Sequence, residues 1–270
     1  MTVFEIRDKA RENSLLGYLF YYERSKRFFA ELLSNTDEWT CPFIFADYVR
    51  KGVYSIDSVR SGKFAEQRII PPDRQNLGAI LKENGLKEYD EYKLLLLSEG
   101  RCAQDELYLV RISEKDIIPE ISKRFAGNVL DVMPLGNLKV LVFFADGKSV
   151  VVDVGRLCRD DRLFGNVLRN DEVFRNVRVS PGGNGIEWGE ERFIPAEILR
   201  ATGRESVISY ADLTGFIQSR LVDTAEAAEI LNCSRQYIKQ LSDKERLTPL
   251  REGANSNLYM RSEIEREFYK

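Results

Sequence analysis

Polar side chains with hydrogen-bonding groups gather on one face of a short predicted helix near residue 238. The set is Arg235, Gln236, Lys239 and Gln240, with Tyr237 at the margin. Ile238 and Leu241 fall on the opposite side and are expected to pack inward. Arginine can form two hydrogen bonds with guanine and glutamine two with adenine. This face therefore carries side chains of the types that contact base edges in a DNA groove.

The residues before this face predict a first helix and a tight turn. Thr224 is expected to cap that helix, and its inner face carries Ala228 and Leu231. Asn232 and Cys233 break it, and Ser234 is expected to cap the second helix. Two short helices joined by a three-residue turn have helix-turn-helix spacing.

The residues that follow predict a wing and a last helix. Two short strands are expected around the turn-rich segment 253–257, and Ser262-x-x-Glu265 has the spacing of a capping box. Three further basic residues are candidates for DNA contacts. They are Lys244, Arg246 and Arg251.

The order helix, turn, helix, wing, helix resembles the winged helix-turn-helix of MerR-type regulators and phage excisionases. The residues that carry the match are Thr224, Glu226, Ala227, Ala228, Leu231, Ser234, Arg235, Ile238, Leu241, Leu247, Tyr259 and Ile264. The resemblance implies that Ser234 to Gln240 enter the major groove of double-stranded DNA. It also implies that the wing around Arg251 approaches the backbone or the minor groove.

The charge distribution limits the affinity expected of one such module. The whole chain carries a formal charge of 3 minus. Residues 230–261 contain six basic and three acidic side chains, a net of 3 plus, whereas residues 221–270 contain eight basic and nine acidic, a net of 1 minus. Neutralising few phosphates predicts weak, salt-sensitive binding, so a homodimer on paired half-sites is expected. A helix-turn-helix used for protein contact is the alternative.

Composition argues against catalysis. The chain contains no histidine, which removes Ser-His-Asp and Cys-His nucleophile systems and every histidine-containing metal site. No catalytic residue, cofactor or metal ligand is predicted, and the protein is not expected to be an enzyme. The cysteines are each more than fifty residues apart and are expected to be reduced thiols. No apolar run suits a signal peptide or a membrane span, so a cytoplasmic protein without a membrane partner is expected.

Changes in periodicity divide the chain into segments of an α+β, multidomain protein, with small antiparallel-sheet domains followed by an α-helical winged helix-turn-helix. The predicted segments are an α+β domain of unknown role at 1–127, a second domain at 128–200, a linker at 201–220 and the winged helix-turn-helix at 221–270.

The first segment is expected to begin with a strand pair closed by a four-residue loop, Glu23 to Lys26. A helix capped by Asp73 and ended by Gly85 should follow. A further helix is expected at 89–97, and a strand from Leu107.

The second segment centres on a predicted hairpin. Asp146-Gly147 lies between two β-rich arms, and a type I′ turn would give both residues positive φ. A short helical crossover and further strands should follow. The segment resembles the small bacterial domain-of-unknown-function 2442 family through Phe144, Asp146, Gly147, Val152, Asp153, Phe174, Val177, Ile186 and Trp188. The resemblance implies a small α+β domain with an antiparallel sheet, an accessory or interaction module sometimes joined to helix-turn-helix units.

Two functions remain open from the sequence. The first is a DNA-binding regulatory protein of bacterial or phage origin, in which residues 1–200 sense, dimerise or bind a protein partner. The alternative is a protein-interaction factor, such as an antitoxin-like, immunity or anti-defence inhibitor, that sequesters a partner. Its helix-turn-helix would then be secondary or autoregulatory.

Overall fold

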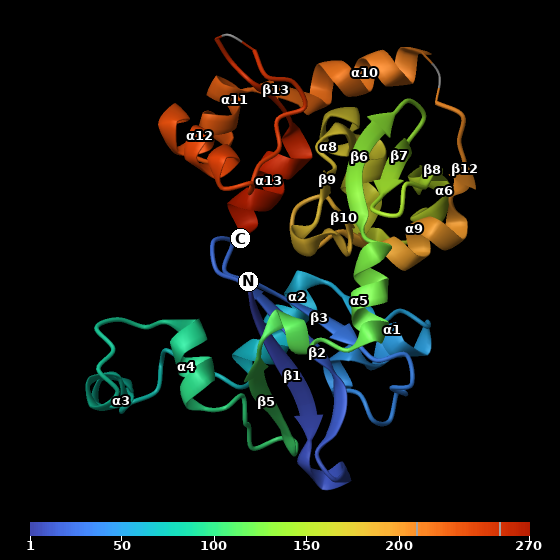
Figure 1. Cartoon of the computed structure of the whole chain (residues 1–270). Coiled ribbons are helices and arrows are strands. Elements are labelled where there is room, and N and C mark those ends of the chain that lie inside the picture. Colours follow the sequence, from blue (N-terminus) through green and yellow to red (C-terminus); the bar gives the residue numbers. More distant parts are fainter. Residues whose placement is uncertain (209, 254) are drawn as a thin grey trace. The chain divides into compact units, whose positions relative to one another are not determined.

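The computed structural model describes residues 1–208, 210–253 and 255–270. The chain forms two compact units: unit 1 is Met1–Tyr21 with Lys26–Ser122, and unit 2 is Tyr22–Ser25 with Lys123–Lys270. Antiparallel sheets and short helices occur in both units (Figure 1). The predicted α+β, multidomain fold class is therefore confirmed.

Unit 1 is built on a five-stranded sheet with the order β4-β3-β2-β1-β5. Its strands are β1 (Thr2–Asp8), β2 (Ser14–Tyr22), β3 (Arg27–Leu32), β4 (Ser55–Ile56) and β5 (Leu107–Ile112). Strands β2 and β3 are neighbours joined by residues 23–26, which confirms the predicted strand pair and its loop. The predicted strand from Leu107 is also confirmed and pairs with β1.

Helices α1 (Ala46–Arg50), α2 (Ser58–Glu66) and α4 (Glu91–Leu97) pack on one face of this sheet. The other helices of this region are α3 (Leu77–Glu83) and α5 (Pro119–Ala126), the last crossing the boundary between the units. Alternate strand residues such as Phe4 and Ile6 share a core cluster with Phe64 of α2 and Leu94 of α4. Burying these large apolar side chains is the main favourable term for folding this unit.

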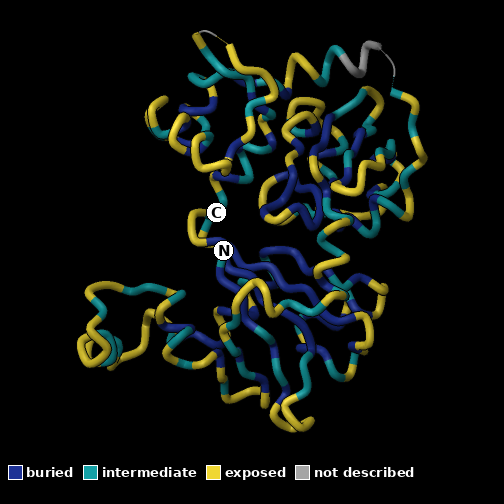
Figure 2. Tube along the Cα trace, in the orientation of Figure 1, coloured by how far each residue is buried: buried dark blue, intermediate teal, exposed yellow. Residues whose placement is uncertain are grey.

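Helix α3 differs from the prediction. It begins after Asn76, which makes no side-chain cap, so the prediction that Asp73 caps it is wrong. The preceding residues form two backbone turns, in which the amide of Arg74 donates to Pro71 O and the amide of Leu77 donates to Arg74 O. The predicted left-handed end is confirmed, since Gly85 has φ of 67°. Figure 2 shows α3 mostly exposed, and none of its residues is buried.

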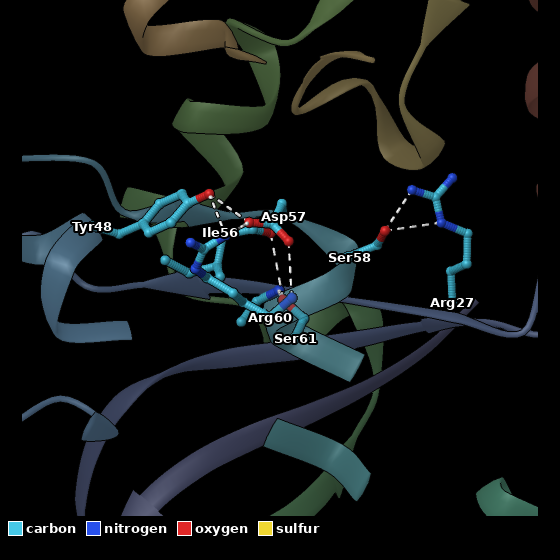
Figure 3. A network of polar contacts seen from close by, with 8 residues as sticks. Arg27, Tyr48, Ile56, Asp57, Ser58, Arg60 and Ser61 are labelled. Atoms are coloured by element: carbon cyan, nitrogen blue, oxygen red, sulfur yellow. Dashed lines mark hydrogen bonds and ion pairs between the residues drawn. The ribbon is translucent and has the colours of Figure 1, made fainter. Parts of the chain in front are cut away.

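A polar network fixes the start of α2 (Figure 3). Asp57 caps the helix by accepting a hydrogen bond from the amide of Arg60 at 2.8 Å, and Tyr48 Oη donates to the same carboxylate. Arg27 Nε donates to Ser58 Oγ at 3.0 Å. Together these contacts join α1, α2 and β3.

Unit 2 contains the predicted segment 128–200, called here the central domain, with two small sheets of order β12-β8-β7-β6 and β11-β10-β9; strand β12 (Arg204–Glu205) comes from the residues that follow this segment. Its strands are β6 (Val129–Leu135), β7 (Lys139–Phe144), β8 (Ser149–Asp153), β9 (Arg178–Val179), β10 (Gly185–Glu187) and β11 (Phe193–Pro195). The predicted crossover is a chain of short helices: α6 (Val154–Leu157), α7 (Gly165–Arg169) and α8 (Asp171–Arg175). Helix α9 (Ala196–Thr202) follows β11.

The predicted hairpin joins β7 to β8, but its turn type was predicted wrongly. Gly147 has φ of 86°, whereas Asp146 is not among the residues with positive φ. The amide of Gly147 donates to Phe144 O, and the amide of Phe144 donates to Lys148 O. This is a type I turn followed by a left-handed glycine, which allows one extra residue in the loop.

Aromatic side chains fill the core of the central domain. Trp188 packs edge-on against Phe164, and its Nε1 donates to Phe174 O at 2.8 Å. Phe144, Phe174 and Ile186, which carry the sequence resemblance, are buried in the same cluster. These residues act as core determinants of the domain.

The segment 201–220, predicted as a linker, contains regular structure. Strand β12 (Arg204–Glu205) pairs with β8 and adds a fourth strand to the larger sheet. Helix α10 (Tyr210–Arg220) follows, and its Phe216 ring lies 5.2 Å from that of Phe143 on β7. Among the described residues, no helix is both long and apolar enough to cross a membrane.

Candidate nucleic-acid interface

Residues 221–270, called here the helix-turn-helix module, form a small body around their own apolar cluster (Figure 1). Its elements are β13 (Leu221–Asp223), α11 (Thr224–Ile230), α12 (Arg235–Asp243), β14 (Leu258–Met260) and α13 (Arg261–Tyr269). Ala227, Ile238, Leu247 and Ile264 are fully buried at its centre. The predicted order of helix, turn, helix, wing and helix is present.

The start of α11 is fixed by Asp223 and not, as predicted, by Thr224. The Asp223 carboxylate accepts hydrogen bonds from the amides of Ala225 and Glu226 at 2.7 and 2.8 Å. Glu226 accepts one in return from the Asp223 amide, which completes a capping box. Thr224 is the first helical residue. Its Oγ1 instead accepts from the amide of Asn257 in the wing at 3.1 Å.

The turn between the helices follows the prediction. Asn232 adopts a left-handed conformation with φ of 48°, which asparagine tolerates better than most residues. Ser234 then caps α12 by accepting from the amide of Tyr237 at 3.2 Å. These two residues set the direction in which α12 leaves the turn.

Helix α12 separates an inner apolar side from an outer polar side. Ile238 and Leu241 are buried, and Tyr237 is half-buried against the same cluster. The remaining predicted contact residues of the segment are exposed. They are Ser234, Arg235, Gln236, Lys239 and Gln240. The structure therefore brings the predicted polar face together on one side of the helix.

The three basic residues outside α12 are placed differently from one another. Lys244 at the end of the helix and Arg251 in the wing are exposed. Arg246 forms an ion pair with Glu267 of α13, whose side chain is only 1% exposed. In the described part of the chain, no ion pair is recorded for Arg235, Lys239, Lys244 or Arg251. Arg246 thus serves the fold of the module, while the other four cations face solvent.

The wing is shorter than predicted. Its first strand is reduced to a single bridge between Arg251 and Leu258, with the amide of Leu258 donating to Arg251 O at 2.9 Å. Its second strand, β14, pairs with β13, a strand that the sequence pattern did not predict. Residue 254, within the predicted turn, lies outside the described residues.

The capping box predicted for α13 is wrong. The helix begins after Met260, which makes no side-chain cap. Ser262 is buried and lies close enough to the Asp131 carboxylate of the central domain to lower the pKa of that group, while Glu265 pairs with Arg261 at 2.9 Å. Ser262 is thus occupied by a tertiary contact and Glu265 by an ion pair within the helix, so neither side chain caps the helix start.

Comparison with known proteins gives limited similarity, and no family model matches the chain. Over 95 residues the chain is 27% identical to the uncharacterized protein 250L of Invertebrate iridescent virus 6, covering 35% of this chain and 66% of the viral protein. The chain thus spans just under two-thirds of that relative. The solved structure of NE0471 from Nitrosomonas europaea, a candidate DNA-binding protein, is 20% identical and covers 46% of this chain and 79% of that one. Its TM-score of 0.27 is too low to show a shared fold.

Proposed function

We propose that this protein is a DNA-binding regulatory protein whose helix-turn-helix module contacts duplex DNA through α12. The observation that supports the proposal most directly is the outer face of that helix. It presents Arg235, Gln236, Lys239 and Gln240 to solvent, while Ile238 anchors the opposite side in the core. A short helix held by its own core, with base-contacting side chains facing outward, suits insertion into a major groove. The MerR and excisionase resemblance stays a prediction.

The electrostatics favour weak binding by a single module. If Arg235 contacts a base, the cations best placed to contact DNA phosphates are Lys239, Lys244 and Arg251. Three phosphate contacts correspond to a slope of log affinity against log salt of about −2.7 for one module and about −5 for two. We therefore propose that two copies of the chain bind paired half-sites.

The test is a fluorescence-anisotropy titration of the full chain with DNA from upstream of its own gene and with a shuffled duplex. We expect the upstream DNA to bind more tightly at two salt concentrations, with a slope near the value for two modules. Equal affinity for the two duplexes would refute sequence-selective binding. A slope near that of one module would refute the dimer.

Two variants separate base contact from phosphate contact. Arg235→Ala should lower the preference for the upstream DNA by about 1–3 kcal/mol. Lys244→Ala should weaken binding to both duplexes alike and reduce the salt slope by about 1. Lys148→Ala, an exposed lysine in the hairpin of the central domain, is the matched control and should change neither quantity. Equal losses on both duplexes for Arg235→Ala would contradict base contact.

A second candidate function, binding of a protein partner, is supported by unit 1. Trp39 and Phe43 are 82% and 95% exposed in the segment before α1. Large exposed aromatic side chains are typical of interaction surfaces, where they become buried. In this proposal residues 1–200 hold the partner, and the module represses its own gene or contributes little.

Copurification with the full chain from its native host tests this second function. The double variant Trp39→Ser/Phe43→Ser should lose the partner, because it removes the two exposed rings without touching the core. Leu163→Ser, an exposed apolar residue of unit 2, is the control. Retention of the same proteins by the double variant would refute binding through this surface.

A further inference from the structure

A cavity of about 860 Å³ lies within unit 2, between the central domain and the helix-turn-helix module. Its walls come from the end of β6, from the segment after α8, from α10 and from α13. The charged residues among the described lining residues are Arg175, Arg178, Arg220, Arg261 and Glu265. Four positive charges minus one negative charge give the lining residues themselves a formal charge of 3 plus, although each of the four arginines is paired with a carboxylate and three of these carboxylates lie outside the lining.

Three of these arginines keep most of their donors unused. Nε of Arg175 pairs with Asp171 at 2.7 Å, Nε of Arg178 with Glu187 at 3.1 Å, and Nε of Arg261 with Glu265 at 2.9 Å. Among the described residues, no partner is recorded for the terminal nitrogens of these three guanidinium groups. A guanidinium presents these terminal N–H groups as a planar fork that matches the oxygens of a phosphate.

Contacts between β6, α10 and α13 fix the two sides of the cavity relative to each other. Arg220, at the end of α10, has a side chain only 9% exposed, and its Nε lies 3.5 Å from Asp131 Oδ1 on β6. The same guanidinium donates to Val132 O, and the buried Ser262 of α13 lies close to the Asp131 carboxylate. Arg266 of α13 donates to Leu130 O at 2.7 Å. Walls held in this way need little ordering when a ligand binds.

The start of α13 adds to the preference for an anion. Arg261 is its first residue and lines the cavity, and no side chain caps the helix. The first amides of a helix lack backbone partners and lie at the positive end of the helix dipole. An uncapped helix start beside three arginine forks favours a ligand with several oxygens and more than one negative charge.

We propose that this cavity binds a small molecule that carries a phosphate or pyrophosphate group. The volume suits a ligand of nucleotide size, and Met133, Pro134 and Val177 offer apolar contacts to the rest of it. Each arginine is in direct ion-pair contact with a carboxylate, from Asp131, Asp171, Glu187 or Glu265, which balances its charge. Recognition therefore depends on short hydrogen bonds from the guanidinium groups to the ligand.

Calorimetric titration of the full chain with inorganic pyrophosphate at constant ionic strength tests the proposal. We expect one pyrophosphate per chain and roughly tenfold weaker binding for Arg175→Gln and for Arg261→Gln. Both arginines have accessible side chains, 64% and 44% exposed, and pair with a carboxylate four residues along their own helix, so these variants should stay folded. Arg159→Gln, an exposed arginine outside the cavity, is the matched control and should bind as the wild type does.

Further arms identify what the cavity recognises. Arg261→Lys keeps the charge but loses the fork, so it too should bind pyrophosphate several-fold more weakly. The absence of saturable binding, or equal losses in Arg159→Gln, would overturn the proposal. Citrate binding as tightly as pyrophosphate would overturn the assignment to phosphate. Displacement of pyrophosphate by a random DNA duplex would show that the site belongs to DNA.

Discussion

Arg246 stabilises the module through an ion pair, whereas the exposed cations of the module are proposed to contact DNA. The sequence pattern places it among the DNA-binding candidates, but the structure pairs it with the buried carboxylate of Glu267. Lys270 also approaches Glu267, with 3.5 Å between Nζ and Oε2. We therefore expect Arg246→Ala to act on the free energy of unfolding. Any loss of DNA binding should then result only from a smaller fraction of folded protein.

The magnitude follows from burial. Removing one partner of a fully buried ion pair costs about 3–5 kcal/mol, because the remaining charge is left uncompensated. The Arg246 side chain is 44% exposed, so water screens part of the pair, and Lys270 keeps part of the compensation. Halving the cost gives about 2 kcal/mol for Arg246→Ala. Lys244 is exposed and forms no ion pair in the described part of the chain. Lys244→Ala should therefore change the free energy of unfolding by less than about 0.5 kcal/mol.

Urea unfolding followed by tryptophan fluorescence measures both effects. The chain has two tryptophans, so Trp39→Phe leaves Trp188 as a reporter inside unit 2. In a Glu267→Gln background, Arg246→Ala should cost much less, because no carboxylate charge is left behind. If Arg246→Ala is as stable as Lys244→Ala and still loses DNA affinity, the guanidinium contacts DNA and the reasoning is refuted.

Three further predictions concern titration, thiol reactivity and the turn. Burial raises the pKa of Asp131 above its ordinary value of 3.8, although Arg220 lowers it. The native state then binds this proton more tightly than the unfolded chain, so stability should fall as pH rises from about 4 through the raised pKa. Urea titrations should show this fall in wild type and not in Asp131→Asn. Burial also raises the pKa of Cys158 to about 12 and of Cys41 to about 11, so Ellman's reagent at pH 8 should reach these two buried thiols only after urea unfolding. Asn232→Val should destabilise the module by about 1–2 kcal/mol in urea, and Asn232→Gly should not, because φ is positive there.

The parts of the site that depend on local sequence were predictable. The turn at Asn232, the cap at Ser234 and the burial of Ile238 each follow from residue type and helical spacing within a few positions. The cap of α11 was within reach as well. Asp223 and Glu226 have capping-box spacing, but Thr224 also suits a cap, and only the pairing of β13 with β14 decides between them.

The parts that depend on distant partners were not predictable from local pattern. Ser262 and Glu265 have capping-box spacing, yet Ser262 is drawn to Asp131 on another element. A buried hydroxyl must find a partner, and a buried carboxylate is a stronger acceptor than an exposed helix start. Nothing within several residues of Ser262 indicates that Asp131 will be there.

The charge of the module shows how such distant pairs change a functional estimate. The excess of 3 plus over residues 230–261 includes Arg246 and Arg261, whose carboxylate partners, Glu267 and Glu265, lie outside that window. Subtracting these two paired arginines leaves four cations against three acidic residues, a net of 1 plus. A net so small cannot attract DNA from a distance, because long-range steering depends on summed charge. In the proposed function, selectivity must then come from contacts made by α12 itself, and affinity from the presence of that helix in two copies of the chain.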